Sequence, residues 1–350
     1  MNRRSFLISI PALAAALPSA LRSMAQSGRR SIPLRAINHV TITVRDPKRS
    51  LEFYQGLFGM PIQSRQGSSV FLQIGRGPQF IGISGTSGPP RISHFCVTTP
   101  NFDSDRIFEI LAEHGVARIE YAASGSEAAG SIGPLKAWLR HRREDRGGSA
   151  EGTPELHFAD PEGILAQIQD ATYCGGAGAL GEVCRAAPEP APTKGRIALQ
   201  DYNHITLGVL DQQRARAFYR ALFGLPTGAD QGGSESLKIG SGRQFLATGT
   251  TTANGGTPGK PNVAHICFTV EGFDLDKIRR TLTEYGLKPG SRTTGSVPPL
   301  THYVSLRMPD RGGAPGGTPE LYLTDPDGIV LQIQDTSYCG GAGYLGNVCA

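Results

Sequence analysis

The sequence lacks the features of a membrane-spanning or nucleic-acid-binding protein. After residue 25 it has no apolar stretch long enough to cross a bilayer. It also has little excess charge, because Arg3, Arg4 and Arg22 supply three of the formal net charge of +5. Residues 141–146 mix both signs and indicate a solvated face rather than a binding patch. We therefore expect no nucleic-acid partner and no membrane span in the mature protein.

A low-complexity block is also missing. The 46 glycines and 25 prolines lie between periodic segments, which indicates many tight turns and short strands. A chain of 350 residues with 39% hydrophobic residues exceeds the usual size of one domain and can fill real cores. The composition therefore favours a β-rich fold of two domains.

The first 25 residues have the pattern of an export signal. Arg3 and Arg4 precede the apolar stretch Ile8 to Leu21, and Ser23-Met24-Ala25 is a small-residue cleavage site. The arginine pair before Ser-Phe-Leu favours a twin-arginine signal, which exports folded proteins, and an ordinary secretory signal is the alternative. We expect a mature protein that is periplasmic or otherwise exported.

The chain contains an internal repeat. Residues 38–41 (Asn-His-Val-Thr) recur as 203–206 (Asn-His-Ile-Thr), and Gln-Ile-Gln-Asp occurs at both 167–170 and 332–335, an offset of 165 each time. Ser93-His94 matches Ala264-His265 at an offset of 171, because the second copy has extra residues near 253–256. With the signal at 1–25 set aside, the repeat predicts domains at 36–185 and 200–350 and a Pro/Ala-rich linker at 186–199.

Each copy is predicted to contain two βαβββ units, which makes the fold α+β with two cupped mixed sheets. Residues 38–44 alternate like a half-buried strand whose polar inner face carries His39. A helix opens at Asp46-Pro47 and ends at Gly59, and short strands follow at 70–74 and 80–83. The second unit repeats this order, with a strand at 92–98, a helix at 103–114 and a last strand at 164–168.

The six cysteines form three pairs by repeat. Cys174 and Cys184 bracket a Gly-rich loop, and Cys339 and Cys349 bracket its repeat. Loops of this kind close easily in an oxidising compartment, so we expect two local disulfides, with a metal-thiolate site as the weaker alternative. Cys96 and its repeat partner at 267 lie two residues past a histidine and are expected to be buried free thiols.

These motifs resemble the vicinal oxygen chelate superfamily of glyoxalases, bleomycin-resistance proteins and extradiol dioxygenases. The resemblance rests on a strand that begins Asn-His, a helix that ends Phe-Tyr-x-x-Leu-Phe-Gly and a hairpin Asp-Pro-(Asp/Glu)-Gly-Ile, each present twice. It covers nearly all of the mature chain. The resemblance implies the fold, but not one function, because the superfamily contains several activities.

The same resemblance implies a metal site in each copy. The positions that match the metal ligands of the extradiol dioxygenases are His39, His94 and Gln167 in the first copy and His204, His265 and Gln332 in the second. The glutamine stands where the family has a glutamate, so the site keeps its two histidines but loses its negative charge and should hold a divalent ion more weakly. The alternative is a site that has lost its metal and binds a small molecule without it.

The strand before the last hairpin carries the other candidates. Tyr322 matches the active-site tyrosine of the extradiol dioxygenases, and the first copy has His157 there. Glu155 and Glu320 lie two residues earlier and are candidates for a missing carboxylate ligand or a general base, with a structural role as the alternative. Arg146 and Arg311 are candidates to bind an anionic substrate. The alternative is a structural role, in which each arginine donates hydrogen bonds to loop carbonyls.

The resemblance favours an exported, metal-dependent dioxygenase of extradiol type that acts on a small aromatic or phenolic compound. The implied cofactor is a divalent metal ion, with Fe(II) or Mn(II) favoured and Zn(II) as a further candidate. A non-catalytic binding protein of the bleomycin-resistance type and a glyoxalase-like isomerase or lyase are the alternatives. The expected partner is a small-molecule substrate, and a homodimer is left open.

Overall fold

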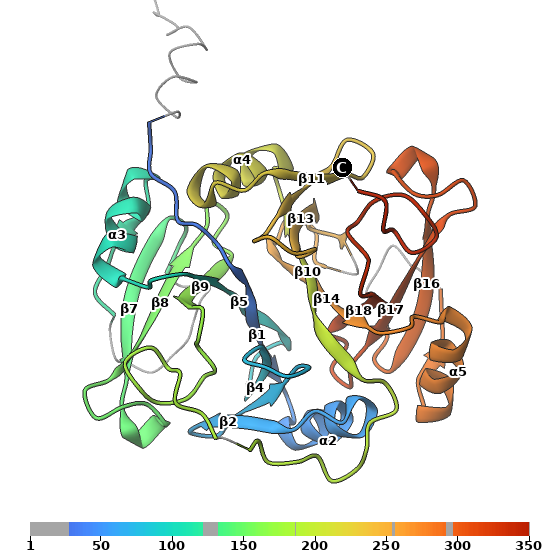
Figure 1. Ribbon diagram of the computed structural model, residues 1–350, viewed down its shortest axis with the longest axis horizontal. Coiled ribbons are helices and arrows are strands. Elements are labelled where there is room, and N and C mark those ends of the chain that lie inside the picture. The colour runs from blue at the N-terminus through green and yellow to red at the C-terminus, as the bar shows by residue number, and fades with distance from the viewer. Residues whose placement is uncertain (1–27, 122–131, 186, 254–255, 292–296, 350) are drawn as a thin grey trace, which may run out of the picture.

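The computed structural model describes residues 28–121, 132–185, 187–253, 256–291 and 297–349, so the expected export signal lies outside the described residues. It consists of two nine-stranded mixed sheets, one from each copy of the repeat (Figure 1). The elements of the first copy are β1 (Ala36–Val44), α2 (Pro47–Phe58), β2 (Ile62–Gln66), β3 (Ser69–Gln73), β4 (Phe80–Gly85), β5 (Arg91–Thr99), α3 (Ser104–Glu113), β6 (Ala117–Arg118), β7 (Lys136–Arg142), β8 (Thr153–Ala159) and β9 (Leu165–Asp170).

The second copy repeats the order. Its elements are β10 (Leu199–Val209), α4 (Gln212–Phe223), β11 (Thr227–Asp230), β12 (Glu235–Lys238), β13 (Phe245–Thr250), β14 (Asn262–Val270), α5 (Leu275–Tyr285), β15 (Lys288–Pro289), β16 (Thr301–Arg307), β17 (Thr318–Thr324) and β18 (Val330–Asp335). The strand order is β2-β3-β4-β1-β5-β9-β8-β7-β6 in one sheet and β11-β12-β13-β10-β14-β18-β17-β16-β15 in the other. The predicted βαβββ units and α+β class are confirmed, and each second unit gains a two-residue edge strand.

The helices begin and end where the sequence predicts. Asp46 caps α2 by accepting from the backbone N–H groups of Lys48 and Arg49, and Pro47 occupies the first turn. Gly59 ends the helix with φ of 67°, a left-handed conformation that glycine adopts without strain. The helix packs against β4, and the opposite face of the sheet forms a cup.

The first strand differs from its prediction in one respect. It was expected to be half buried, yet every residue from 37 to 44 is buried. The apolar side chains of β1 belong to a core that includes residues of both copies, while its polar side chains line the cup. Both faces are therefore covered.

The two copies interlock through their first helices. The Tyr54 hydroxyl on α2 donates to Asp325 in the last hairpin of the second copy at 3.2 Å, and the Tyr219 hydroxyl on α4 donates to Asp160 in the first at 2.9 Å. Figure 1 shows the consequence, with α2 beside the second copy and α4 beside the first. The copies are thus one packed unit with approximate twofold symmetry.

The expected cysteine pairs are bonded. Cys174 joins Cys184 with an S–S distance of 2.06 Å, and Cys339 joins Cys349. Cys96 and its repeat partner at 267 are buried free thiols, as predicted.

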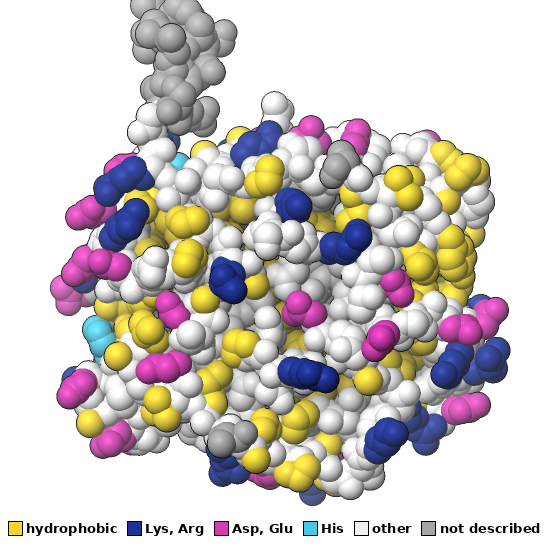
Figure 2. Space-filling view, in the orientation of Figure 1, with side chains coloured by type: hydrophobic (Ala, Val, Ile, Leu, Met, Phe, Trp, Pro, Cys, Tyr) yellow, Lys and Arg dark blue, Asp and Glu magenta, His cyan; other side chains and the backbone are white. Residues whose placement is uncertain are grey.

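The surface agrees with the modest charge of the sequence. Lys/Arg and Asp/Glu side chains are interspersed over the face drawn in Figure 2. None of the helices in the described ranges is long and apolar enough to span a membrane.

The burial of Asp325 predicts a pH-dependent effect on stability. Burial raises the folded-state pKa of Asp325 to about 6, whereas an unfolded aspartate titrates near ~3.9. Between these values the folded state holds a proton that the unfolded state lacks, so the free energy of unfolding falls as the pH rises from about 4 to about 6 and levels off above that. Asp325→Asn removes the titration. The free energy of unfolding of the variant, relative to that of the wild type, should therefore increase by on the order of 2–3 kcal/mol from pH 4 to pH 8.

Denaturant unfolding at both pH values measures this difference. Asp335→Asn is the control, because hydrogen bonds from Ser337 and Phe273 outweigh partial burial and lower the pKa of Asp335. Its effect should change little between pH 4 and pH 8, and in the opposite direction, because a lowered pKa is that of a group that stabilises the fold more as the pH rises. A difference for Asp325→Asn that does not change with pH would contradict a raised pKa.

Candidate metal centre

The predicted ligands lie in one row across each sheet. In the first copy the neighbouring strands are β1, β5, β9 and β8, in that order. The residues that stand opposite one another across these four strands are His39, Cys96, Gln167 and His157. His94 lies one step away, opposite Thr41. Because paired residues of neighbouring strands point to the same face, the register aims these side chains into the cup.

The second copy has the same row. Its members, in order across the sheet, are His204, Cys267, Gln332 and Tyr322, with His265 opposite Thr206. The structure thus brings together all six predicted ligands, three in each cup. All six are buried.

An asparagine fixes the orientation of the first histidine in each copy. Asn38 donates through Nδ2 to the carbonyl of Tyr173 at 2.8 Å, which leaves its Oδ1 to face Nδ1 of His39 at 2.7 Å. Since Oδ1 only accepts, Nδ1 carries the proton and Nε2 keeps its lone pair. Asn203 makes the same contacts with Tyr338 and His204, at 2.7 and 2.8 Å.

Ser93 fixes the tautomer of His94 in the same way as Asn38 fixes that of His39. The Ser93 hydroxyl donates to the carbonyl of Thr41 at 3.0 Å, so its oxygen accepts from Nδ1 of His94 at 3.1 Å. Nε2 of His94 is then an acceptor as well. The second copy has Ala264 at the matching position, and Nε2 of His265 lies 3.2 Å from the Thr206 hydroxyl.

The ring nitrogens therefore converge, and in the first copy both are acceptors with no proton between them. In the first copy Nε2 of His39 lies 3.3 Å from Nε2 of His94 and 3.2 Å from Oε1 of Gln167. In the second, Nε2 of His204 lies 3.1 Å from Nε2 of His265. Two ligands bound to one ion at 2.0–2.1 Å would be separated by about 3.0–3.4 Å, so these side chains fit a metal ion.

The titration of the histidines agrees with this arrangement. Burial, with a further contribution from the neighbouring histidine, holds the pKa of His39 well below its ordinary value, and the same causes act on His204. Both rings are therefore neutral, which is the form that binds a metal.

Gln332 is the least satisfied member of the set. It lies close enough to His204 to oppose the fall in its pKa, yet among the described residues neither amide atom is in hydrogen-bonding geometry. A buried amide without partners is costly, and a metal ion would satisfy its oxygen. No three His, Cys, Asp or Glu side chains converge in the described part of the chain, so the glutamine completes the fullest donor set.

A buried ion-pair network supports each cup. Glu320 accepts from Nε of the fully buried Arg307 at 2.9 Å and from the hydroxyls of Tyr338 at 3.0 Å and Tyr322 at 3.3 Å. Arg307 also donates to the carbonyl of Gly341 in the disulfide loop at 2.9 Å. Glu320 thus holds Tyr322 and the loop in place.

In the first copy the matching carboxylate of Glu155 accepts hydrogen bonds from two arginines and a tyrosine. It accepts from Arg142 at 2.7 Å, from Tyr173 at 3.0 Å and from Arg140, whose side chain lies in the cup. Although burial alone would raise the pKa of Glu155, the arginines hold it well below its ordinary value. This carboxylate is a structural anion, and its oxygens are already taken.

The two cups differ in size. The cavity of the first is about 50 Å³ and that of the second about 420 Å³. Arg140, which reaches Glu155, has Ser305 at the matching position opposite Glu320. The shorter side chain leaves the second cup open. Exposed Arg146 and Arg311 line the first and second cups respectively.

The residues beside Gln167 and Gln332 give the cups different chemistry. His157 stacks on Trp138 and meets His94 edge to face, and burial lowers its pKa to about 3. Tyr322 stacks on Tyr303 with centroids 5.1 Å apart, and its ring lies edge to face with His265 at 5.4 Å. Burial, reinforced by Glu320, raises the pKa of Tyr322 well above its ordinary value, so its phenol keeps its proton.

Sequence reasoning missed the supporting side chains. Phe80 stacks on His39 with centroids 4.3 Å apart and Phe245 on His204 at 4.4 Å. These phenylalanines were not singled out, and the two asparagines entered only as part of the Asn-His motif, with no role assigned. The signal that could have found them is the repeat, because each pair recurs at the offset of 165.

Comparison with known families gives one match. The family model described as Glyoxalase/Bleomycin resistance protein/Dioxygenase superfamily matches residues 36–168 and again 201–333. No curated protein gives a significant match.

Solved structures share the fold at low identity. A catechol 2,3-dioxygenase superposes with a TM-score of 0.54 and 16% identity over 89% of each chain. A Mn(II)-bound glyoxalase from Novosphingobium aromaticivorans gives 0.52 and 15% over 86% of this chain and 82% of that one. Homoprotocatechuate 2,3-dioxygenase from Brevibacterium fuscum gives 0.56 and 13% over 88% and 83%. These identities support a common fold and leave the activity open.

The contact between Asn203 and His204 predicts the tautomer of that histidine. In metal-free wild-type protein, imidazole ¹⁵N shifts should report one neutral tautomer with the proton on Nδ1. Asn203→Ala removes the acceptor, so a mixture of tautomers should appear and the free energy of unfolding should fall by about 1–3 kcal/mol. Asn38→Ala is the matched control and should leave the His204 signals unchanged. A single Nδ1–H tautomer that persists in Asn203→Ala would contradict the assignment.

Proposed function

The chain belongs to the glyoxalase/bleomycin resistance protein/dioxygenase superfamily, and from that premise we propose that its second domain is a metal-dependent dioxygenase of extradiol type. The proposed substrate is a small aromatic or phenolic compound with vicinal oxygens. The observation that carries the proposal is the open second cup, in which His204, His265 and Gln332 converge beside the protonated Tyr322.

The proposed ligands are all neutral, and this affects the metal they would hold. Two imidazoles and an amide oxygen are borderline and hard donors that suit Fe(II) or Mn(II), with Zn(II) also compatible. When bound, such an ion would supply a positive centre for vicinal substrate oxygens and for dioxygen. Without a carboxylate the ion keeps its full charge, which favours anionic phenolates but weakens retention of the ion itself.

The protein's own groups would then position and protonate the substrate. Tyr322 lies next to Gln332 in the row, and Glu320 accepts from its hydroxyl at 3.3 Å. In this geometry its one proton points to Glu320, and Tyr322 would donate that proton to a substrate oxygen once the O–H turns away from the carboxylate. Arg311, among the exposed residues that line this cup, is proposed to bind an anionic substituent of the substrate.

The first domain is proposed to have a different role. Its ligand set His39, His94 and Gln167 is equally convergent, but a cavity of about 50 Å³ has no room for an aromatic ring. We propose that it binds a metal without turning over substrate. His157 and Arg146 then have no substrate to contact, and Glu155 stays structural.

One observation favours a second candidate, a non-catalytic small-molecule-binding protein. The missing carboxylate in both ligand sets is what a cup would show after it lost its metal. Elemental analysis of anaerobically purified mature protein separates the candidates. One or two equivalents of metal per chain support the enzyme, and none, with a retained organic ligand, supports the binder.

Export is part of the proposal. The two local disulfides favour an oxidising compartment, and Arg3-Arg4 favours the twin-arginine route.

The proposed ligand Gln332 predicts a ratio of metal affinities. Gln332→Glu adds an anion beside a divalent cation and should tighten binding at the second site, whereas Gln332→Ala should weaken it by about 10-fold or more. His265→Ala should abolish binding there. Competition with a chelator on folded protein measures the constants. Equal affinities in the Glu and Ala variants would mean that Gln332 does not contact the metal, and Glu320 would become the next candidate.

The proposed role of Tyr322 predicts a loss of turnover. With metal-loaded protein and a panel of catechols, Tyr322→Phe should lower kcat for oxygen uptake by about 10²–10⁴-fold, as removal of a general acid does, with little change in metal content. Tyr303→Phe is the matched control, because it removes a hydroxyl from the ring stacked on Tyr322. Similar losses in the two variants would argue against a proton-transfer role for Tyr322.

A further inference from the structure

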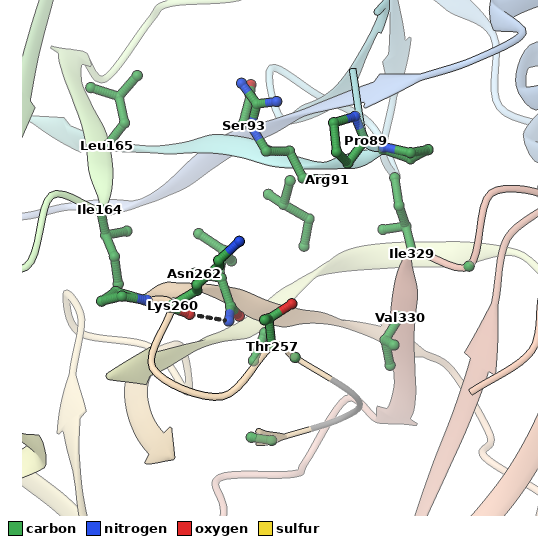
Figure 3. A pocket seen from close by; sticks show the side chains of 18 of the residues that line it. Pro89, Arg91, Ser93, Ile164, Leu165, Thr257, Lys260, Asn262, Ile329 and Val330 are labelled. Carbon is green, nitrogen blue, oxygen red and sulfur yellow. Dashed lines mark hydrogen bonds between the residues drawn. The ribbon is translucent and has the colours of Figure 1, made fainter. Parts of the chain in front are cut away.

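A third cavity lies between the domains (Figure 3), and of its lining residues Ala253 alone also lines the second cup. Matching segments of the two copies form it: the residues at the starts of β5 and β14, and the hairpins that lead into β9 and β18. Figure 3 shows Pro89, Arg91 and Ser93 on one side and Thr257, Lys260 and Asn262 on the other, with Ile164 and Leu165 at one flank and Ile329 and Val330 at the opposite flank. Neither domain alone contains this cavity.

The size and walls of the interdomain cavity suit a small molecule. Its volume of about 500 Å³ falls within the roughly 300–1,000 Å³ of ordinary ligand pockets. The walls include Ile92, Val263 and the four aliphatic residues of the hairpins, so most of a ligand placed here would contact apolar side chains. The cavity therefore favours an apolar body.

Most polar groups on its walls are already engaged. The Asp327 carboxylate accepts from the Arg49 guanidinium and from the Arg45 backbone N–H, each at 3.0 Å. The Ser93 hydroxyl is held between Thr41 and His94, and the Asn262 amide nitrogen donates to the carbonyl of Lys260 at 3.0 Å. These groups offer little to a ligand.

Two cations are the exception. Arg91 and Lys260 are exposed at the rim, and within the described residues no carboxylate forms an ion pair with either side chain. They come from different domains. Because Asp327 is already neutralised by Arg49, the local charge is positive and complements an anion.

We propose that the interdomain cavity binds an apolar monocarboxylate of the fatty-acid type. Its carboxylate pairs with Arg91 or Lys260, the cations on opposite sides of the cavity, and its hydrocarbon chain lies against the aliphatic walls. Binding requires both domains, which gives the duplicated fold a site that a single copy lacks. The proposal needs no metal and stands or fails independently of the dioxygenase.

Calorimetric titration of the whole mature protein with octanoate tests this site. Wild-type protein should bind one octanoate per chain, and 1-octanol, which lacks the charge, should bind at least about tenfold more weakly. The double variant Arg91→Gln/Lys260→Gln should weaken octanoate binding by about tenfold or more, since hydrogen bonds to charged groups are lost. Arg91→Lys/Lys260→Arg keeps both charges and should retain most of the affinity.

Arg311→Gln distinguishes this cavity from the second cup. It should leave octanoate binding unchanged, because Arg311 does not line the interdomain cavity. The absence of saturable binding would overturn the proposal. Loss of binding in Arg311→Gln but not in the Arg91/Lys260 double variant would assign the acid to the cup, and equal affinity for octanol would remove the role of the cations.

Discussion

Strand register is the constraint on which the candidate centre depends. The ligands of each copy come from three strands that are distant in sequence, and hydrogen bonding between β1, β5 and β9, or β10, β14 and β18, brings them level. Side chains alternate between the two faces of a strand, so a slip of one residue in either pairing would turn a histidine or the glutamine out of the cup. The buried apolar residues on the opposite face fix the register, because the same slip would expose them. The core thus specifies the geometry of the cup.

The two copies share the strand register and the buried ion-pair network, but they differ in the side chains that fill the cup. Glu155 and Glu320 each accept from a buried arginine that also holds the disulfide loop, so the network is common to both copies and structural. Arg140 and Ser305 occupy the same place beside that glutamate, and only the arginine fills the cup. One side chain therefore accounts for much of the difference between a closed and an open cavity on one scaffold.

Local signals in the sequence were enough to predict the helices and strands, and the repeat was enough to predict that the fold is duplicated. Asp46-Pro47 and Gly59 bounded a helix correctly because capping acts within a few residues. The ligand positions were accessible only through resemblance to a family, since no local rule states that β9 pairs in parallel with β5. The same limit explains why Cys96, expected to lie along the strand from His94, was not foreseen between His39 and Gln167. The role of Arg140 was also hidden, because it depends on contact with Glu155 across the sheet.

The disulfide loops connect the candidate centre with the proposed export route. Asn38 takes its orientation from the carbonyl of Tyr173, the residue before Cys174, so the centre is complete only when that loop is in place. Noncovalent contacts also hold the loop, since Arg142 donates to Gly176 and the Thr153 hydroxyl donates to Gly178. A short disulfide contributes about 2–3 kcal/mol, mainly by restricting the unfolded chain. The native contacts can therefore position the loop, and with it the histidine, before the cysteines are oxidised. Under the proposed twin-arginine route the chain would fold, and would bind the proposed metal, in a reducing compartment and gain its disulfides afterwards, which is the order that export of a folded protein requires.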